Sequence, residues 1–303
     1  MSFARKYRAE LVLILLTILW GGTFVLIKKA LTHVSPFVFV SFRFGLASLI
    51  LLPFVWKHFK NINGAALKDG LWIGVLFFGG FILQTVGLQY TTSTKSAFIT
   101  GTFVIFTPIF QSLIEKRIPS VRNIISIAIV SAGIILLSAK EGSVFSVFTE
   151  IGETFNFGDF LTLLCAIIFG VYIVYLDIIS KKHYHLYVTF SQVFTTFMIA
   201  VICLPLFNVT GIENIKLNFH PDLFIAVGYT VIFATLVTIT LQSKFQKEVT
   251  PTKAAIIYSS EPLFATITAY IIIGETLTPL GMAGAGIILA GLLFSELGKS
   301  GED

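Results

Sequence analysis

The segment IIYSSEPLFATITAYIIIGE, residues 256–275, decides the class of fold. It is almost wholly apolar, and a helix of roughly 20 residues is long enough to cross the 30 Å of hydrocarbon in a bilayer. Inside it lies one carboxylate, Glu261, followed at once by Pro262, a residue that removes a backbone donor and bends helices. Three roles are open to Glu261: substrate ligand, proton carrier or structural strut.

The rest of the chain is as apolar as this segment. Of its 303 residues, 55% are hydrophobic and 12% are charged, and the mean hydropathy is +0.90. Soluble proteins carry about 25% charged residues, so we predict an all-α integral membrane protein that binds lipid and no nucleic acid. Ten spans are expected, at residues 11–30, 36–56, 70–90, 95–115, 121–138, 158–179, 186–207, 222–243, 252–273 and 279–297.

The distribution of basic residues predicts the orientation. If the N-terminus is cytoplasmic, 15 Lys and Arg residues fall in cytoplasmic segments and 5 fall outside, while Arg43 lies within a span. Cytoplasmic loops carry the excess of positive charge, so both termini are expected in the cytoplasm. The first apolar run is too long for a signal peptide and is expected to remain as a span.

The two halves of the sequence resemble each other weakly. SPFVFVSFRF (35–44) aligns with YHLYVTFSQV (184–193), and TKSAFI (94–99) aligns with TKAAII (252–257). The offsets are 149 and 158 residues, so each half holds five spans. An odd number of spans inverts the second half, and inverted repeats are typical of secondary transporters, whose substrate site lies near the bilayer midplane.

Two ionisable residues lie deep in predicted spans, Arg43 and Glu261. A charged group at the bilayer centre is costly, so each is expected to face a cavity or a partner. Arg43 is a candidate for holding a substrate carboxylate or for serving as a structural counter-charge. For Glu261 the adjacent Pro262 favours a structural role, and Pro108 in the first half is the matching candidate for a bend.

Uncharged polar and aromatic side chains complete the set of candidates. Side chains with an apolar body and a polar tip suit the wall of a binding cavity, although interhelical hydrogen bonds or an interfacial belt could also explain them. The substrate-binding candidates are Trp20, Arg43, Gln84, Tyr90, Tyr172, Gln192, Tyr258 and Glu261.

Enzyme motifs are missing from the sequence. It holds no His-Glu-x-x-His, no Gly-x-Ser-x-Gly and no phosphate-binding Walker loop. All five His residues fall in loops or at span ends, and Cys165 and Cys203 are expected to pack as small apolar groups. We expect no catalytic residue, no metal ligand and no cofactor.

Four stretches carry a family resemblance. LWGGTFVLIKKAL (19–31), SPFVFVSFRFGLASLILLP (35–53), GLQYTTSTKSAFITGTFVIFTPIF (87–110) and SSEPLFATITAYIIIGETLTPLGMAGAGIILAG (259–291) resemble EamA-domain permeases of the drug/metabolite transporter (DMT) superfamily. The resemblance implies two inverted EamA repeats around a central cavity lined by the first four helices of each half. The candidate residues fall on those helices.

The resemblance also implies the organisation and activity of the chain. The first repeat would cover residues 1–140, an extracytoplasmic linker 141–157 and the second repeat 158–303. The expected function is a permease of the cytoplasmic membrane, monomeric or homodimeric, that exports small metabolites such as amino acids by alternating access. An importer of a vitamin or nucleotide sugar and a multidrug efflux pump remain alternatives, whereas a receptor, a scaffold and an intramembrane enzyme are disfavoured.

Overall fold

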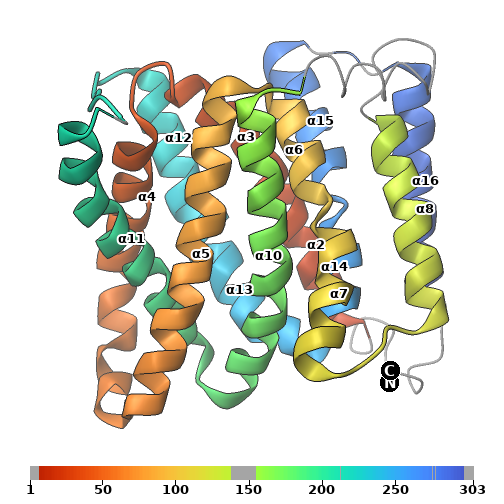
Figure 1. The fold of residues 1–303 in the computed structure, drawn as a ribbon, viewed down its shortest axis with the longest axis horizontal. Coiled ribbons are helices and arrows are strands. Elements are labelled where there is room, and N and C mark those ends of the chain that lie inside the picture. The colour runs from red at the N-terminus through yellow and green to blue at the C-terminus, as the bar shows by residue number, and fades with distance from the viewer. Residues whose placement is uncertain (1–6, 138–154, 212, 275, 277, 297–303) are drawn as a thin grey trace.

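The computed structural model describes residues 7–137, 155–211, 213–274, 276 and 278–296, which form a bundle of helices (Figure 1). Within this part of the chain the single β pairing is an isolated bridge between Val34 and Leu217. The elements are α2 (Arg8–Gly21), α3 (Thr23–Ala30), α4 (Pro36–Val55), η1 (Trp56–Asn61), α5 (Gly64–Tyr90), α6 (Ser93–Gly101), α7 (Phe103–Glu115), α8 (Val121–Leu137), α10 (Phe157–Lys182), α11 (His185–Val209), α12 (Pro221–Val231), η2 (Ile232–Val237), α13 (Thr238–Phe245), η3 (Gln246–Glu248), α14 (Pro251–Tyr258), α15 (Glu261–Ile273) and α16 (Pro279–Glu296).

Each predicted span is mostly helical within the described residues. Within the described residues, eight helical runs are long and apolar enough to cross a membrane. The apolar helices Val121–Leu137 and Pro279–Ser295 are shorter. The chain is thus an all-α membrane protein, whereas the number of ten spans stays a prediction. Residues 141–154 of the predicted linker 141–157 lie outside the described part of the chain.

The helices α2 and α10 begin at opposite ends of the bundle. Glu10, in the first turn of α2, accepts a hydrogen bond from Lys253 at 2.8 Å. Nearby, Lys247 donates to the carbonyl of Ser180, in the last turn of α10. Asp159 lies in the first turn of α10 and therefore at the other end. These ends are called the Glu10 end and the Asp159 end below.

Two spans are interrupted at positions that the internal repeat relates. Thr102 separates α6 from α7, and Ser260 lies in the interruption between α14 and α15. The two residues are 158 positions apart, the offset found in this part of the sequence. Their amides make equivalent bonds, Thr102 to the carbonyl of Ile99 and Ser260 to that of Ile257, both at 3.1 Å. The fourth helix of each half is therefore broken at the same level.

The two candidate hinge prolines lie differently relative to these interruptions. Pro262 occupies the first turn of α15, where the missing amide hydrogen would have no helical partner. Pro108 lies inside α7, six residues beyond Thr102. The interruption itself is thus the feature common to both spans, and a hinge role for either proline stays a prediction.

Helices α8 and α16 pack side by side at one edge of the bundle (Figure 1). Their backbones touch at Gly133 and Gly284: a Cβ added to Gly284 would lie 2.6 Å from the carbonyl oxygen of Gly133. Small residues allow such close approach between membrane helices. The glycine-rich face of the last helix therefore serves a contact within the chain.

Candidate functional site

A cavity lies among the helices. Its lining comes from seven of the helical spans, four in the first half of the chain and three in the second. The lining residues are Trp20, Thr23, Arg43, Phe77, Phe81, Gln84, Phe103, Phe169, Tyr172, Ile173, Ile239, Gln242, Tyr258 and Glu261.

Arg43 brings a positive charge to the cavity wall. Its side chain, 2% exposed, donates from Nε to Oγ1 of Thr235 and from Nη2 to the carbonyl of Ala234, both at 2.9 Å. The guanidinium carbon also lies 4.7 Å from the ring centre of Phe81, a cation–π distance. No carboxylate in the described part of the chain lies within 4.0 Å of it. The charge is held by neutral groups and is available to an anion.

Both acceptors for Arg43 come from an irregular helical segment. Ala234 and Thr235 belong to η2, a π-helical stretch between α12 and α13. A π turn shifts hydrogen bonding from the fourth to the fifth residue, and such turns are frequent at functional sites. This segment therefore positions the guanidinium from the opposite half of the chain.

Glu261 brings a carboxylate to the same cavity. It is the first residue of α15 and is 8% exposed. A helix N-terminus stabilises negative charge through its free amides. Among the described residues, the carboxylate has no ion-pair partner, and the side chain of the N-cap residue Ser260 does not cap the helix. It is thus available to a ligand or a proton.

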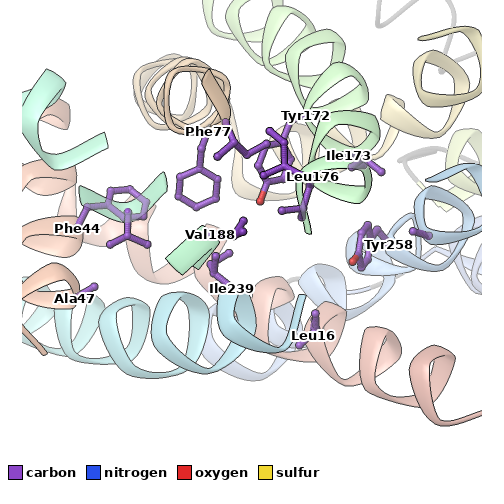
Figure 2. Packing of buried hydrophobic residues seen from close by; sticks show 14 of the residues in the cluster. Leu16, Phe44, Ala47, Phe77, Tyr172, Ile173, Leu176, Val188, Ile239 and Tyr258 are labelled. Atoms are coloured by element: carbon purple, nitrogen blue, oxygen red, sulfur yellow. The ribbon is translucent and has the colours of Figure 1, made fainter. Parts of the chain in front are cut away.

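Aromatic rings form much of the remaining wall. The ring of Tyr258 meets the edge of Trp20 with 5.3 Å between centroids, and Phe77 lies 5.5 Å from Tyr172. In Figure 2, Phe77, Tyr172 and Tyr258 come from three different helices. Such a wall suits a ligand with apolar or planar parts.

A network of amides and hydroxyls closes one side of the cavity. The hydroxyl of Tyr172 donates to Oε1 of Gln192 at 2.8 Å, and that of Tyr258 donates to Oε1 of Gln246 at 3.1 Å. Gln242 donates from Nε2 to Oε1 of Gln246 at 3.3 Å. The network joins α10, α11, α13 and α14, so it fixes the orientation of the aromatic wall.

Six of the eight predicted substrate-binding residues line this cavity. Gln192 lies behind Tyr172 and reaches the wall only through its hydrogen bond. Tyr90 is not part of the group: it is 56% exposed at the end of α5, with its ring against Phe157. The sequence predicted that Tyr90 lies on a span that lines the cavity, but it did not predict how far along that helix the cavity lies.

Some site residues were not predicted. Gln242 lines the cavity, and Thr235 holds Arg43. A row of polar residues on one face of the segment TLVTITLQSKFQ (235–246) could have indicated them in the sequence. Gln84 was predicted, and its partner Thr100 accepts its hydrogen bond at 3.2 Å.

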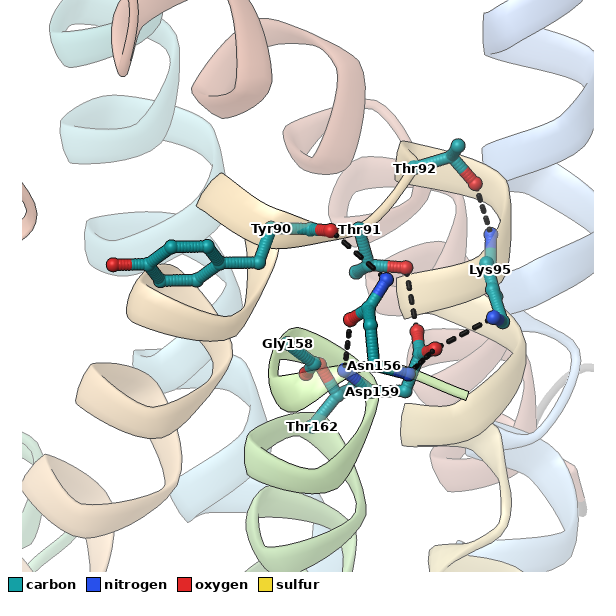
Figure 3. Close-up of polar contacts among 8 residues, drawn as sticks. All are labelled: Tyr90, Thr91, Thr92, Lys95, Asn156, Gly158, Asp159 and Thr162. Carbon is teal, nitrogen blue, oxygen red and sulfur yellow. Dashed lines mark hydrogen bonds and ion pairs between the residues drawn. The ribbon is translucent and has the colours of Figure 1, made fainter. Parts of the chain in front are cut away.

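An ion pair joins the two halves at the Asp159 end. Lys95 at the start of α6 meets Asp159 of α10 with 2.5 Å between Nζ and Oδ2, and the carboxylate is fully buried. Oδ1 of Asp159 accepts from the hydroxyl of Thr91 at 2.6 Å, and Oδ2 also accepts from the amide of Asn156 at 2.9 Å (Figure 3). The carboxylate is thus satisfied by three donors.

A second ion pair joins the halves at the Glu10 end. Lys253, at the start of α14, meets Glu10 of α2 at 2.8 Å. Glu10 and Asp159 are 149 residues apart, and Lys95 and Lys253 are 158 residues apart, which are the two offsets of the sequence repeat. The pairs are therefore equivalent: each joins an acid on the first helix of one half to a lysine on the fourth helix of the other.

These features define a class of protein. A polytopic bundle with a charged, aromatic cavity between two related halves is the architecture of a membrane transporter. The EamA-like transporter family model matches residues 7–139 and 156–297, and the chain belongs to this family. It is a transporter that takes a small-molecule substrate, not an enzyme.

Related sequences and a solved structure are consistent with membership of this family. An uncharacterized transporter of Archaeoglobus fulgidus is 33% identical over 97% of this chain and 87% of its own length. An S-adenosylmethionine/S-adenosylhomocysteine transporter of Chlamydia muridarum is 24% identical over 99% of this chain and 97% of its own. A solved crystal structure at 14% identity superposes with a TM-score of 0.72, covering 96% of this chain and 98% of that one, so the two share a fold.

Proposed function

We propose that the chain is a secondary transporter that moves small metabolites such as amino acids out of the cell by alternating access. The observation that carries this is the pair of ionisable groups in one aromatic cavity: among the described residues, Arg43 has no carboxylate partner and Glu261 has no cationic one. A zwitterion offers a carboxylate to the first and an ammonium to the second. The ring-lined remainder suits its side chain.

The arrangement of the halves supports alternating access. Residues 1–140 and 158–303 would form two inverted five-helix repeats joined by the linker 141–157. Because each ion pair links the two halves, separation at either end breaks one pair and leaves the other intact. The pairs Lys95–Asp159 and Lys253–Glu10 would then act as the two gates. The Glu10 end would be cytoplasmic, together with both termini.

The substrate can be identified by transport into liposomes. Purified protein would be reconstituted and supplied with labelled amino acids, S-adenosylmethionine, vitamins, nucleotide sugars and cationic drugs, with and without a pH gradient. Uptake of an amino acid or a related zwitterion is the expected result. Preference for a nucleotide sugar, a vitamin or a drug cation would instead select the importer or efflux alternatives.

The cavity variant Arg43→Ala tests whether transport uses this site. Its transport should fall to the background of empty liposomes while the protein remains in the membrane. The matched control is Arg122→Ala, which removes an exposed arginine at the start of α8. Wild-type transport by Arg43→Ala would exclude this cavity as the substrate site.

A further inference from the structure

Two histidines and an aspartate from distant segments gather outside the cavity. His33 follows α3, and His220 and Asp222 flank the start of α12. One side-chain atom of each lies within 4.8 Å of the others, and all three side chains are partly exposed. The substrate cavity does not include them. The site therefore requires its own explanation.

The geometry points to a binding site for a divalent transition-metal ion, such as Zn²⁺, held by His33, His220 and Asp222. Oδ2 of Asp222 lies 3.3 Å from Nδ1 of His220 and 3.8 Å from Nε2 of His33. Ligands bound tetrahedrally at about 2.0–2.1 Å lie about 3.4 Å from one another. The two separations from Oδ2 are close to this, and rotation of the rings about their side-chain bonds would bring the three atoms onto one ion. The ion would replace the bond that Nδ1 of His220 accepts from the amide of Asp222 at 3.3 Å.

The donor types select the class of metal. Two imidazoles and one carboxylate suit Zn²⁺, Ni²⁺ and Cu²⁺, whereas Mg²⁺ and Ca²⁺ prefer all-oxygen sites. The His33 and His220 rings stack with 3.9 Å between centroids and 13° between planes. An imidazole nitrogen binds a metal ion in the plane of its own ring, so one of the two rings must turn out of this stack for both to reach the same ion. Three protein ligands leave a fourth position for water.

The backbone holds the two ligand-bearing segments together. The amide of Asn218 donates to the carbonyl of His33 at 2.9 Å, and that of Ser35 donates to the carbonyl of Lys216 at 3.0 Å. The ammonium of Lys216 is held by the carbonyl of Thr32. Because these bonds fix the segments before an ion arrives, binding needs little further ordering of the backbone.

The site would bridge the two halves of the transporter. His33 lies in the first half, and His220 and Asp222 lie in the second. A bound ion adds a link between the loop before α4 and the loop before α12. On the proposed transport cycle, this link would hold the two halves together at one face and slow transport.

Metal titration of the full-length protein tests the site. Tag-free protein in detergent, stripped with EDTA, would be titrated with Zn²⁺ by calorimetry and with Co²⁺ by visible absorption. We expect one ion per chain, and intense d–d bands of Co²⁺ in a four-coordinate site. His33→Ala, His220→Ala and Asp222→Asn should each weaken Zn²⁺ binding at least tenfold, while Mg²⁺ should not compete.

The controls are the histidines elsewhere in the chain. His58→Ala and His183→Ala should leave the Zn²⁺ affinity unchanged, because the two rings contact Tyr184 and Asp69 instead. Variants would be compared only if they elute as the wild type does; His220→Gln is the smaller alternative change. No saturable binding by the wild type, or equal affinity in all three ligand variants, would overturn the site. Zn²⁺ binding is measured without substrate, so its outcome does not depend on the proposed transport function. The effect of Zn²⁺ on transport is a separate measurement, and failure of one can be told from failure of the other.

Discussion

The guanidinium of Arg43 is held by the hydroxyl of Thr235, at 2.9 Å, across 192 residues of sequence. The arginine belongs to α4 of the first half and the threonine to η2 of the second. A cavity charge supplied by one half is therefore oriented by the other. Any movement between the halves changes the position of the charge.

Thr235→Val should weaken substrate binding and spare the fold. The change removes one acceptor of the guanidinium, and a hydrogen bond to a charged group contributes about 1.5–3 kcal/mol. We expect KM to rise roughly tenfold or more, with the amount of protein in the membrane unchanged. Thr230→Val is the control, since its hydroxyl bonds only within its own helix. An unchanged KM in Thr235→Val would show that Arg43 is positioned by other contacts.

Glu261→Gln distinguishes the roles of the buried carboxylate. Glutamine keeps the shape and cannot exchange a proton, so a proton-coupled carrier would lose its response to a pH gradient. If the carboxylate holds a substrate ammonium, KM should instead rise at every pH. Initial rates at several pH values, with and without a gradient, separate the two. Normal transport at every pH would leave Glu261 with a structural role.

The two ion pairs should respond to charge reversal as pairs. Lys95→Glu and Asp159→Lys should each impair transport, and the double exchange should restore part of it. The same holds for Glu10→Lys and Lys253→Glu. Restoration by the double exchange is the expected signature of a direct pair. Double variants no better than the worse single variant would remove the ion pairs from the transport cycle.

The burial of the acids predicts unequal effects on stability. Asp159→Asn removes a fully buried carboxylate that accepts from Lys95, Thr91 and the amide of Asn156, and a hydrogen bond to a charged group contributes about 1.5–3 kcal/mol. Glu10 and Lys253 are partly exposed, at 13% and 19%, so Glu10→Gln should destabilise less. Thermal unfolding in detergent measures both. Equal shifts in Tm would contradict the difference in environment.

Gly284→Ala should destabilise the contact between α8 and α16. The added methyl group would meet the backbone amide of Leu137 and the carbonyl of Gly133. Overpacking of this kind costs about 1–3 kcal/mol. Tm should fall while KM is unchanged, because neither helix lines the cavity. Gly286→Ala is the matched control, since its Cβ would meet nothing within 4 Å.

Glu213 should make stability depend on pH. Burial raises the pKa of this carboxyl, although bonds from Ser35 and from the amide of Phe37 oppose the shift. The folded state therefore binds its proton more tightly than the unfolded state, so this contribution is present at low pH and is lost as pH rises above the ordinary carboxyl pKa. Glu213→Gln should remove it. The Tm of the wild type should then decline relative to the variant as pH increases; parallel Tm curves would contradict this.

The sequence was sufficient to locate the helices because apolar runs of span length are unambiguous. In the part of the chain that the structure describes, the predicted ranges are mostly helical, and the offsets of 149 and 158 residues relate the two ion pairs. Burial of Arg43 and Glu261 also followed from their place within apolar runs. The span positions and the burial depend on local composition, and the offsets depend on the similarity of the two halves.

The remaining features depend on how helices meet. Tyr90 and Tyr172 look alike in sequence, but only the second points into the cavity. The π-helical segment that positions Arg43 has no glycine or proline to mark it. Hydrogen bonds such as that between Glu10 and Lys253 join residues 243 positions apart, and no local pattern specifies them.

The unequal surroundings of Asp159 and Glu10 affect which conformation the transporter adopts without substrate. Opening at the Asp159 end would remove the two donors that the first half supplies, Thr91 and Lys95, from a fully buried carboxylate, whereas opening at the Glu10 end breaks the partly exposed bond between Glu10 and Lys253. Without substrate, the transporter would be open mainly at the Glu10 end. Substrate would then bind efficiently from the Glu10 end even at low substrate concentration. The conformational change that opens the Asp159 end would be the slow step of each transport cycle.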